Sequence, residues 1–139
     1  MERVDERVPS FKGWVDTVPL AIRRDQLWEF ETYQKALYLT ELSWFDCKDL
    51  RKDSLGRPIA DQLIRSAGSI AANIEEGYGR GFGKDYARFL RFSLGSARET
   101  RGWYYRGRRL LDDGQINHRI QLISEIIGGL VNASNTQRT

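Results

Sequence analysis

The sequence predicts an all-α protein, an up-down-up-down antiparallel four-helix bundle that is preceded by an N-terminal arm. Three observations predict this fold. Apolar residues recur at helical spacing in four long segments, short connectors rich in glycine, proline or aspartate separate these segments, and no stretch has the alternation typical of a strand. Short connectors make consecutive helices antiparallel neighbours. At 139 residues the chain is long enough for one core, so one domain is expected.

Residues 1–26 are expected to form an extended arm with one short turn near residues 11–18, because Pro9, Gly13 and Pro19 interrupt any sustained periodicity. The arm is too apolar for a solvated tail, so we expect it to lie against the bundle or a neighbouring subunit. Its apolar residues are Trp14, Val15, Val18, Leu20 and Ile22. The bundle is expected over residues 27–133 and a polar tail over residues 134–139.

The first helix of the bundle is predicted over about residues 28–49. Its apolar residues at helical spacing are Phe30, Tyr33, Leu37 and Trp44, and the face is widened by Leu39, Leu42 and Phe45. The following stretch, residues 51–58, contains Gly56 and Pro58 and is predicted to be a connector. Glycine and proline end one helix, and proline is tolerated in the first turn of the next.

The second helix is predicted to run from this connector to about residue 76. Its apolar stripe is Leu63, Ala67, Ile70 and Ile74, and its small residues are Ser66, Gly68, Ser69, Ala71 and Ala72. Small residues let helix axes approach closely, so packing can stabilise a helix whose residues are weak helix formers. We expect Asn73 and Glu76, near its end, to hydrogen-bond across helices to Arg65 or to the start of the third helix, which would fix the register.

The third helix is predicted over about residues 84–111, and the fourth follows Asp112, Asp113 and Gly114, whose carboxylates suit a helix N-terminus. The apolar stripe of the fourth helix is Ile116, Ile120, Ile123, Ile127, Leu130 and Val131. Leu122 and Ile126 extend apolar character around this helix. A bundle core needs one face only, so this surplus predicts that the fourth helix contacts another subunit.

One face of the third helix is predicted to bind a polyanion. At 100° per residue, six cations fall within an arc of roughly 80° opposite the apolar face; these are Lys84, Arg88, Arg91, Arg98, Arg106 and Arg109. Arg101 and Arg108 broaden the basic side, whereas the helix has only two acids, Asp85 and Glu99. A solvated face paired with acids of neighbouring helices is the alternative, and the scarcity of acid favours phosphate binding.

Aromatic residues lie among these arginines. Trp103, Tyr104 and Tyr105 could stack on unpaired bases, although Tyr104 falls on the apolar face and is expected in the core. Upstream, glycines alternate at positions 77, 79, 81 and 83 before Lys84. Their spacing does not fit a phosphate-binding P-loop, so we predict a turn with positive φ between the second and third helices, where Arg80 and Lys84 could meet a phosphate.

The composition argues against an enzyme. Cys47 and His118 are the only cysteine and the only histidine, which leaves no disulfide, no thiolate cluster and no histidine pair for a metal. An acid and base pair of Glu76 and Glu99 lacks the Glu-x-x-His motif of carboxylate-bridged iron sites. We therefore expect no catalytic residue, no metal and no cofactor. No apolar run approaches the roughly 20 residues that cross a membrane, so a soluble cytoplasmic protein is expected.

The basic residues are of an unusual kind, since seventeen of the 22 are arginine. A guanidinium can hold a phosphate through two hydrogen bonds and can stack on bases, so this bias suits nucleic acid. A GC-rich genome would favour arginine codons as well, and composition does not separate these two explanations.

Several motifs resemble those of a bacterial four-helix-bundle family encoded in intervening sequences of 23S rRNA genes. They are the run over residues 62–80, Asp85-Tyr86-Ala87-Arg88, Gly95-Ser96-Ala97-Arg98-Glu99, Tyr33-Gln34-Lys35-Ala36 and Gly128-Gly129-Leu130. The likeness covers about residues 27–133, and relatives of the family include the accessory variability proteins of diversity-generating retroelements. Asn73, Glu76 and Gly77 match a family motif in which alanine stands at the position of Glu75.

The resemblance implies a function without chemistry of its own. A basic homopentameric ring would bind RNA or an RNA–DNA hybrid and scaffold a partner such as a retroelement reverse transcriptase. Five copies would multiply the formal charge of +3 on each chain. The alternative is a protein–protein interaction bundle, associated with an rRNA intervening sequence, whose arginines meet acidic protein surfaces and do not bind nucleic acid directly.

Overall fold

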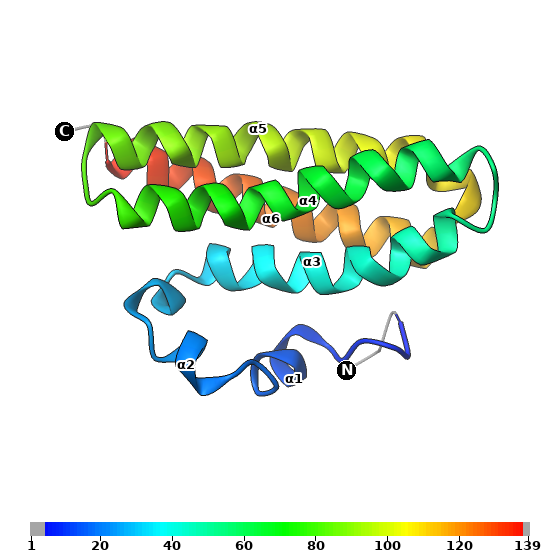
Figure 1. Cartoon of the computed structure of the whole chain (residues 1–139), viewed down its shortest axis with the longest axis horizontal. Coiled ribbons are helices and arrows are strands. Elements are labelled where there is room, and N and C mark those ends of the chain that lie inside the picture. Colours follow the sequence, from blue (N-terminus) through cyan, green and yellow to red (C-terminus); the bar gives the residue numbers. More distant parts are fainter. Residues whose placement is uncertain (1–4, 138–139) are drawn as a thin grey trace.

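The computed structural model of the protein describes residues 5–137 (Figure 1). Within these residues the chain is all-helical and has no strand, which confirms the predicted class. The four long helices are α3 (Glu31–Leu50), α4 (Gly56–Gly79), α5 (Lys84–Arg106) and α6 (Asp113–Thr136). The short elements are α1 (Phe11–Val15), α2 (Leu20–Arg23) and the 3-10 turns η1 (Gln26–Glu29) and η2 (Arg108–Leu110).

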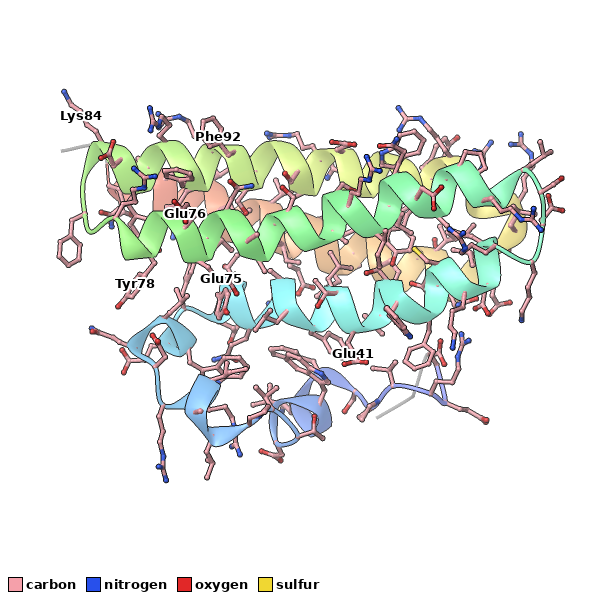
Figure 2. All side chains as sticks on the ribbon, viewed as in Figure 1. Glu41, Glu75, Glu76, Tyr78, Lys84 and Phe92 are labelled. Atoms are coloured by element: carbon pink, nitrogen blue, oxygen red, sulfur yellow. The ribbon has the colours of Figure 1, made fainter. Side chains whose placement is uncertain are left out.

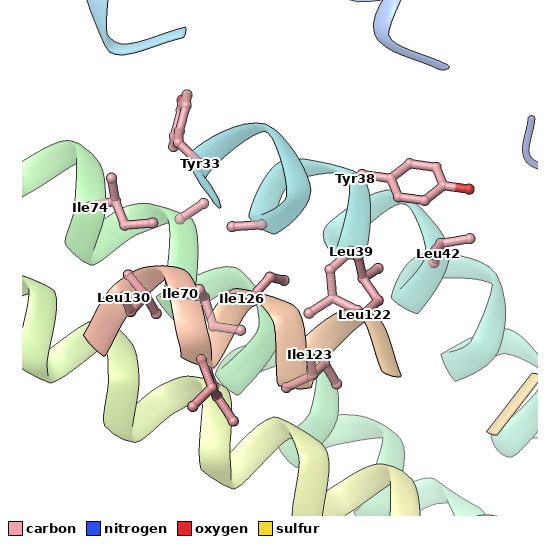
Figure 3. Close-up of a cluster of buried hydrophobic side chains, with 14 of the residues drawn as sticks. Tyr33, Tyr38, Leu39, Leu42, Ile70, Ile74, Leu122, Ile123, Ile126 and Leu130 are labelled. Atoms are coloured by element: carbon pink, nitrogen blue, oxygen red, sulfur yellow. The ribbon is translucent and has the colours of Figure 1, made fainter. Parts of the chain in front are cut away.

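The four long helices lie alongside one another, and the chain reverses at each connector between them (Figure 1). Helices α3 and α5 each contact both α4 and α6. The apolar faces of the four helices therefore meet in one core. Leu39, Ile70, Ile123 and Leu130 are fully buried there, and Figure 3 shows these side chains converging from α3, α4 and α6. Each buried side chain of this size contributes about 1.5–3 kcal/mol of hydrophobic stabilisation.

The predicted core face of α3 is rotated in the structure. Trp44, predicted to be part of the stripe, is 58% exposed, whereas Leu39 and Leu42 are fully buried. The difference arises because α3 is covered on three sides, by α4, by α6 and by the arm. Its buried residues therefore spread around the helix and leave Trp44 on the remaining side.

The apolar surplus of α6 has a similar explanation. Leu122 and Ile126, expected to contact another subunit, are buried within the chain (Figure 3). Because α6 packs against both α3 and α5, it needs more than one apolar stripe. Packing within the chain therefore accounts for Leu122 and Ile126, and a subunit contact of α6 stays a prediction.

Hydroxyl groups join α4 to α5 where small residues bring them close. Thr100 Oγ1 donates to Ser66 Oγ at 2.9 Å, and Ser93 Oγ donates to the carbonyl oxygen of Ile70 at 2.7 Å. At Gly77 a Cβ would lie 2.6 Å from the Cβ of Phe89. The predicted close approach of the second helix is therefore seen along its contact with α5.

Some predicted boundaries are wrong by a few residues. Helix α4 continues to Gly79, and α5 ends at Arg106, five residues before the predicted end of the third helix. Gly107 follows, which is buried and a poor helix former, and η2 comes next. Helix α6 extends to Thr136, so the first part of the predicted polar tail is helical. Residues 138–139 of that tail lie outside the described residues.

The arm lies along α3 on the side away from the core (Figure 1). Trp14 and Val18 are buried, and the Trp14 ring lies 5.3 Å from that of Tyr38 on α3. The Tyr38 hydroxyl donates to the carbonyl oxygen of Pro9 at 2.7 Å. These contacts confirm that the arm packs against the bundle, although it contains α1, α2 and η1 and is less extended than predicted. Residues 1–4 of the predicted arm lie outside the described part of the chain.

A buried polar network that the sequence did not suggest links α3, α5 and α6. Arg119 of α6 and Asp46 of α3 form an ion pair at 2.8 Å, and both side chains are fully buried. Tyr104 of α5 donates its hydroxyl to the same carboxylate at 2.7 Å, and Gln115 donates to it at 3.1 Å. Since buried charges are stabilised only when paired and hydrogen-bonded, this network specifies how the three helices meet.

Candidate nucleic-acid interface

Helix α5 presents a cationic face to solvent, as its periodicity predicts. Its exposed cations are Lys84, Arg88, Arg91, Arg98 and Arg106, and its buried residues include Tyr86, Leu90, Ala97 and Tyr104. Figure 2 shows Lys84 projecting at the start of α5 and Phe92 further along it. The face exists because a straight helix keeps residues three and four apart on one side.

The cations of α5 have no acidic partner in the part of the chain that the structure describes. Within residues 5–137 no side chain of α5 forms an ion pair. The two acids of the helix are exposed, and Glu99 accepts a hydrogen bond from Trp103 Nε1 at 3.0 Å. The predicted alternative, a face whose charges pair with acids of neighbouring helices, is therefore not what the structure shows. Other cations of the chain, such as Arg51 and Lys35, do form ion pairs.

The far end of the basic face differs from the prediction. Arg108 and Arg109 belong to η2, so they do not continue the wheel of α5, although Arg109 is exposed. Arg108 lies over the ring of Tyr105, 4.1 Å from its centroid. Arg106 lies over Trp103 in the same way, at 4.7 Å. Such cation–π pairs hold guanidinium groups at the surface. Arg108 also donates from Nη1 to the carbonyl oxygen of Tyr105 at 3.0 Å.

Arg101 lies at the boundary between α5 and α6. It is half-buried, and its Nη1 donates to Ser124 Oγ on α6 at 3.3 Å. The neighbouring exposed side of α6 is polar and mostly uncharged, and its exposed residues include Asn117, Gln121, Asn132 and Asn135. Its one glutamate, Glu125, pairs with Lys35 at 3.1 Å. Sequence reasoning missed this surface, although the uncharged polar residues of α6 recur on one side of its helical wheel.

The three aromatic residues near the end of α5 have different environments. Tyr104 is fully buried, as predicted. Tyr105 is 56% exposed, and Trp103 is half-buried against the core. Tyr105 is thus the most exposed ring of this group, although Arg108 lies over one face of it.

The connector between α4 and α5 is the predicted glycine turn. Gly81 and Gly83 have φ values of 101° and 77°, in the region that favours glycine. Arg80 is exposed at the end of α4, where it pairs with Glu76 at 3.1 Å and lies over the ring of Phe89. Of the cations predicted to bind nucleic acid, Arg80 is therefore the one with an acidic partner in the described residues.

The predicted interhelical network of Arg65, Asn73 and Glu76 is wrong in its partners. Glu76 pairs with Arg80 one turn along its own helix, and Arg65 is exposed on α4. Asn73 Nδ2 donates to the carbonyl oxygen and to Oγ of Ser69, also within α4. These side chains point away from the core because the buried side of α4 carries Ser66, Ile70 and Ile74. Next to Asn73, a hydrogen bond across to α5 is made by Ser69, whose Oγ accepts from Ser96 at 3.0 Å.

The remaining ionisable groups of the described residues show no cluster suited to a metal ion. Among residues 5–137 no three side chains of His, Cys, Asp or Glu gather at a place that could hold an ion. Cys47 is buried, and this burial raises the pKa of its thiol to about 12. His118 is half-buried beside Arg119, and burial together with this positive charge lowers its pKa.

Across the described residues, no helix combines the length and the apolar character needed to cross a membrane.

Comparison with known proteins agrees with the resemblance inferred from the motifs. A family model described as 23S rRNA-intervening sequence protein matches residues 29–132. A crystal structure from Bacteroides thetaiotaomicron VPI-5482, described as a protein with unknown function from the S23 ribosomal protein family, is similar with a TM-score of 0.69. It is 24% identical, and the match covers 74% of this chain and 97% of that chain, which supports the fold alone. A search of curated proteins finds no match.

Proposed function

Because the chain belongs to the family of 23S rRNA-intervening sequence proteins, we propose that it is a non-enzymatic accessory protein that binds RNA or an RNA–DNA hybrid. In this proposal its long helices form an up-down-up-down antiparallel four-helix bundle, and α5 carries the binding surface. The observation that supports it best is that α5 presents five exposed cations and forms no ion pair within residues 5–137.

Phosphate binding follows from the chemistry of this face. A guanidinium that has no carboxylate partner can exchange water and mobile anions for phosphate oxygens without breaking an intramolecular ion pair. The helix has 23 residues, and at a rise of 1.5 Å per residue it extends for roughly 35 Å, enough to follow several phosphates of a backbone. Binding through phosphates carries no base information, so sequence-specific recognition is not part of this proposal.

We further propose that the protein acts as a homopentameric ring, as the family resemblance implies. Trp44 and Ile64 are exposed and line a hollow of about 340 Å³ between α3 and α4, which offers an apolar surface for a neighbouring subunit. A ring would bring five α5 faces together and raise the local potential for polyanions. It would hold the nucleic acid near a partner enzyme, such as the reverse transcriptase of a retroelement.

The same hollow favours a second candidate function. A protein–protein interaction bundle would use Trp44 and Ile64 to dock a partner, and its arginines would meet acidic protein surfaces. Large exposed aromatic residues beside a hollow are typical of protein interfaces. This function requires no contact with nucleic acid.

Salt-titrated binding separates the two functions. The affinity of the purified protein for a structured RNA and for an RNA–DNA hybrid is measured between about 50 and 300 mM salt. With about five phosphates neutralised per subunit, the logarithm of the affinity should fall against that of the salt concentration with a slope of about −4 or steeper. A slope near zero, or no binding at low salt, would favour the protein-interaction function. Light scattering of the same sample gives the absolute mass and tests the pentamer.

A further inference from the structure

The connector between α4 and α5 exposes an aromatic side chain at one end of the molecule. Phe82 is 87% exposed, the largest value for any large apolar residue that the structure describes. A phenylalanine in water does not stabilise the fold, because it gains nothing from burial. Its place at the start of the cationic face of α5 points to a ligand.

The backbone on both sides of Phe82 is held by hydrogen bonds. Gly81 N donates to the carbonyl oxygen of Tyr78 at 3.2 Å, and Gly83 N donates to the side chain of Gln137 at 3.3 Å. Gly81 and Gly83 also adopt positive φ, which residues with a Cβ rarely do. Phe82 therefore lies in a short turn whose backbone is hydrogen-bonded on both sides. In this turn the Phe82 side chain points to solvent.

A cationic hollow adjoins this turn. It has a volume of about 390 Å³ and is lined by Lys84, Arg88 and Arg91, together with Ala87 and one acid, Asp85. None of the three cations forms an ion pair with a carboxylate of residues 5–137. Three cations against one carboxylate favour an anion, and Lys84 is only two residues from Phe82.

The connector between α3 and α4, at the opposite end of the bundle, differs in its cations and in its apolar side chain. Leu55 is 77% exposed there, and two of its three neighbouring cations are paired. Arg51 pairs with Asp61, and Lys52 pairs with Asp49 at 3.5 Å. Arg57 is exposed and forms no ion pair with a carboxylate of residues 5–137. The α4–α5 connector thus differs in placing an aromatic ring, which can stack on a base, beside three cations without ion pairs.

We infer that Phe82 stacks on an unpaired base of the bound RNA while Lys84, Arg88 and Arg91 hold the adjoining phosphates. An aromatic ring beside cations is the combination that binds single-stranded nucleic acid, because every base offers a face for stacking and every linkage offers a phosphate. A base within a duplex is already stacked on its neighbours, so this site selects a loop, a bulge or a single-stranded end. The inference rests on the proposed function. It adds that the RNA bound at the N-terminal end of α5 contains unpaired bases.

The test compares two RNA duplexes that share one paired sequence and contain no loop, one blunt at both ends and one with a single-stranded tail. Their affinities are measured for the full-length wild type and for the variants Phe82→Ala, Phe82→Trp and, as a matched control at the other end, Leu55→Ala. Phe82→Ala should lower the affinity for the tailed duplex about tenfold, the loss typical of one stacked base. Its affinity for the blunt duplex should stay within about twofold, and Phe82→Trp should bind the tailed duplex like the wild type.

The remaining outcomes separate this inference from the proposed function. If Phe82→Ala binds both duplexes like the wild type, or loses affinity for both equally, the stacking site is wrong while RNA binding by α5 stands. If the wild type binds neither duplex, the proposed function itself fails. If Phe82→Ala lowers the mass in solution and leaves RNA binding unchanged, Phe82 belongs to a protein contact and the inference is overturned.

Discussion

Arg119 donates hydrogen bonds from Nε and Nη2 to both carboxylate oxygens of Asp46, at 2.8 and 3.0 Å, and both side chains are fully buried. The two residues come from α6 and α3, and Tyr104 of α5 donates to the same carboxylate. One carboxylate therefore joins three helices inside the bundle.

Removing one member of this pair should strongly destabilise the protein. Arg119→Met leaves the carboxylate of Asp46 buried without its counter-charge, so the free energy of unfolding should fall by about 3–5 kcal/mol. The double variant Asp46→Leu, Arg119→Met removes both charges and should lose less than the sum of the two single variants. Urea denaturation followed by circular dichroism measures all four proteins. Strictly additive losses would show that the two side chains are not coupled.

Arg7 should make stability depend on pH in the acid range. It donates hydrogen bonds to Asp5 and to Asp49, and these hydrogen bonds from the guanidinium hold the pKa of both carboxyls below their ordinary value. Because the folded pKa lies below the unfolded one, this stabilisation is present above pH of about 4 and is lost as the pH falls through the folded pKa values.

The variant Arg7→Met tests this dependence. At pH 7 it should be less stable than the wild type by up to about 1 kcal/mol, since the Arg7 side chain is partly exposed. The difference should shrink as the pH is lowered from 5 towards 2. Chemical denaturation at several pH values measures it, and a difference that stays constant over this range would contradict the assignment.

Two glycines of α4 should respond to alanine in opposite directions. At Gly68 a Cβ meets nothing within 4 Å, so Gly68→Ala should stabilise the helix by about 0.5–1 kcal/mol. At Gly77 a Cβ would lie 2.6 Å from the Cβ of Phe89, so Gly77→Ala should force α4 and α5 apart and cost about 1–3 kcal/mol. Thermal unfolding compares the two variants directly. A stabilising Gly77→Ala would mean that the two helices are less closely packed than the structure shows.

Charge reversal on α5 should remove nucleic-acid binding without affecting the fold. The double variant Arg91→Glu, Arg98→Glu should lower the affinity for RNA by about tenfold or more and reduce the magnitude of the salt slope by roughly 2. Lys12→Glu, Arg24→Glu makes the same change of charge at two exposed positions of the arm and is the matched control. Fluorescence anisotropy with labelled RNA measures affinity, and light scattering checks the mass. Equal losses in both variants would point to net charge and away from this face.

Local features of the protein could be predicted from the sequence because they depend on helix geometry and on single residues. The outward direction of Arg88, Arg91 and Arg98 follows from 100° per residue, whatever α5 packs against. The positive φ of Gly81 and Gly83 follows from the lack of a Cβ. The cationic face and the turn at its start, which carry both proposals, are features of this kind.

Other features depended on which helices became neighbours. Asp46 and Arg119 are separated by 73 positions, and nothing in the pattern around either residue indicates its partner. Trp44 was predicted to be buried and is exposed, and Leu122 was expected at a subunit contact and is buried. The sequence alone determined the helices, the cationic side of α5 and the glycine turn. Only the tertiary structure decided which charges are paired in the core and which cations and aromatic rings remain for a ligand, since burial is set by contacts between distant segments.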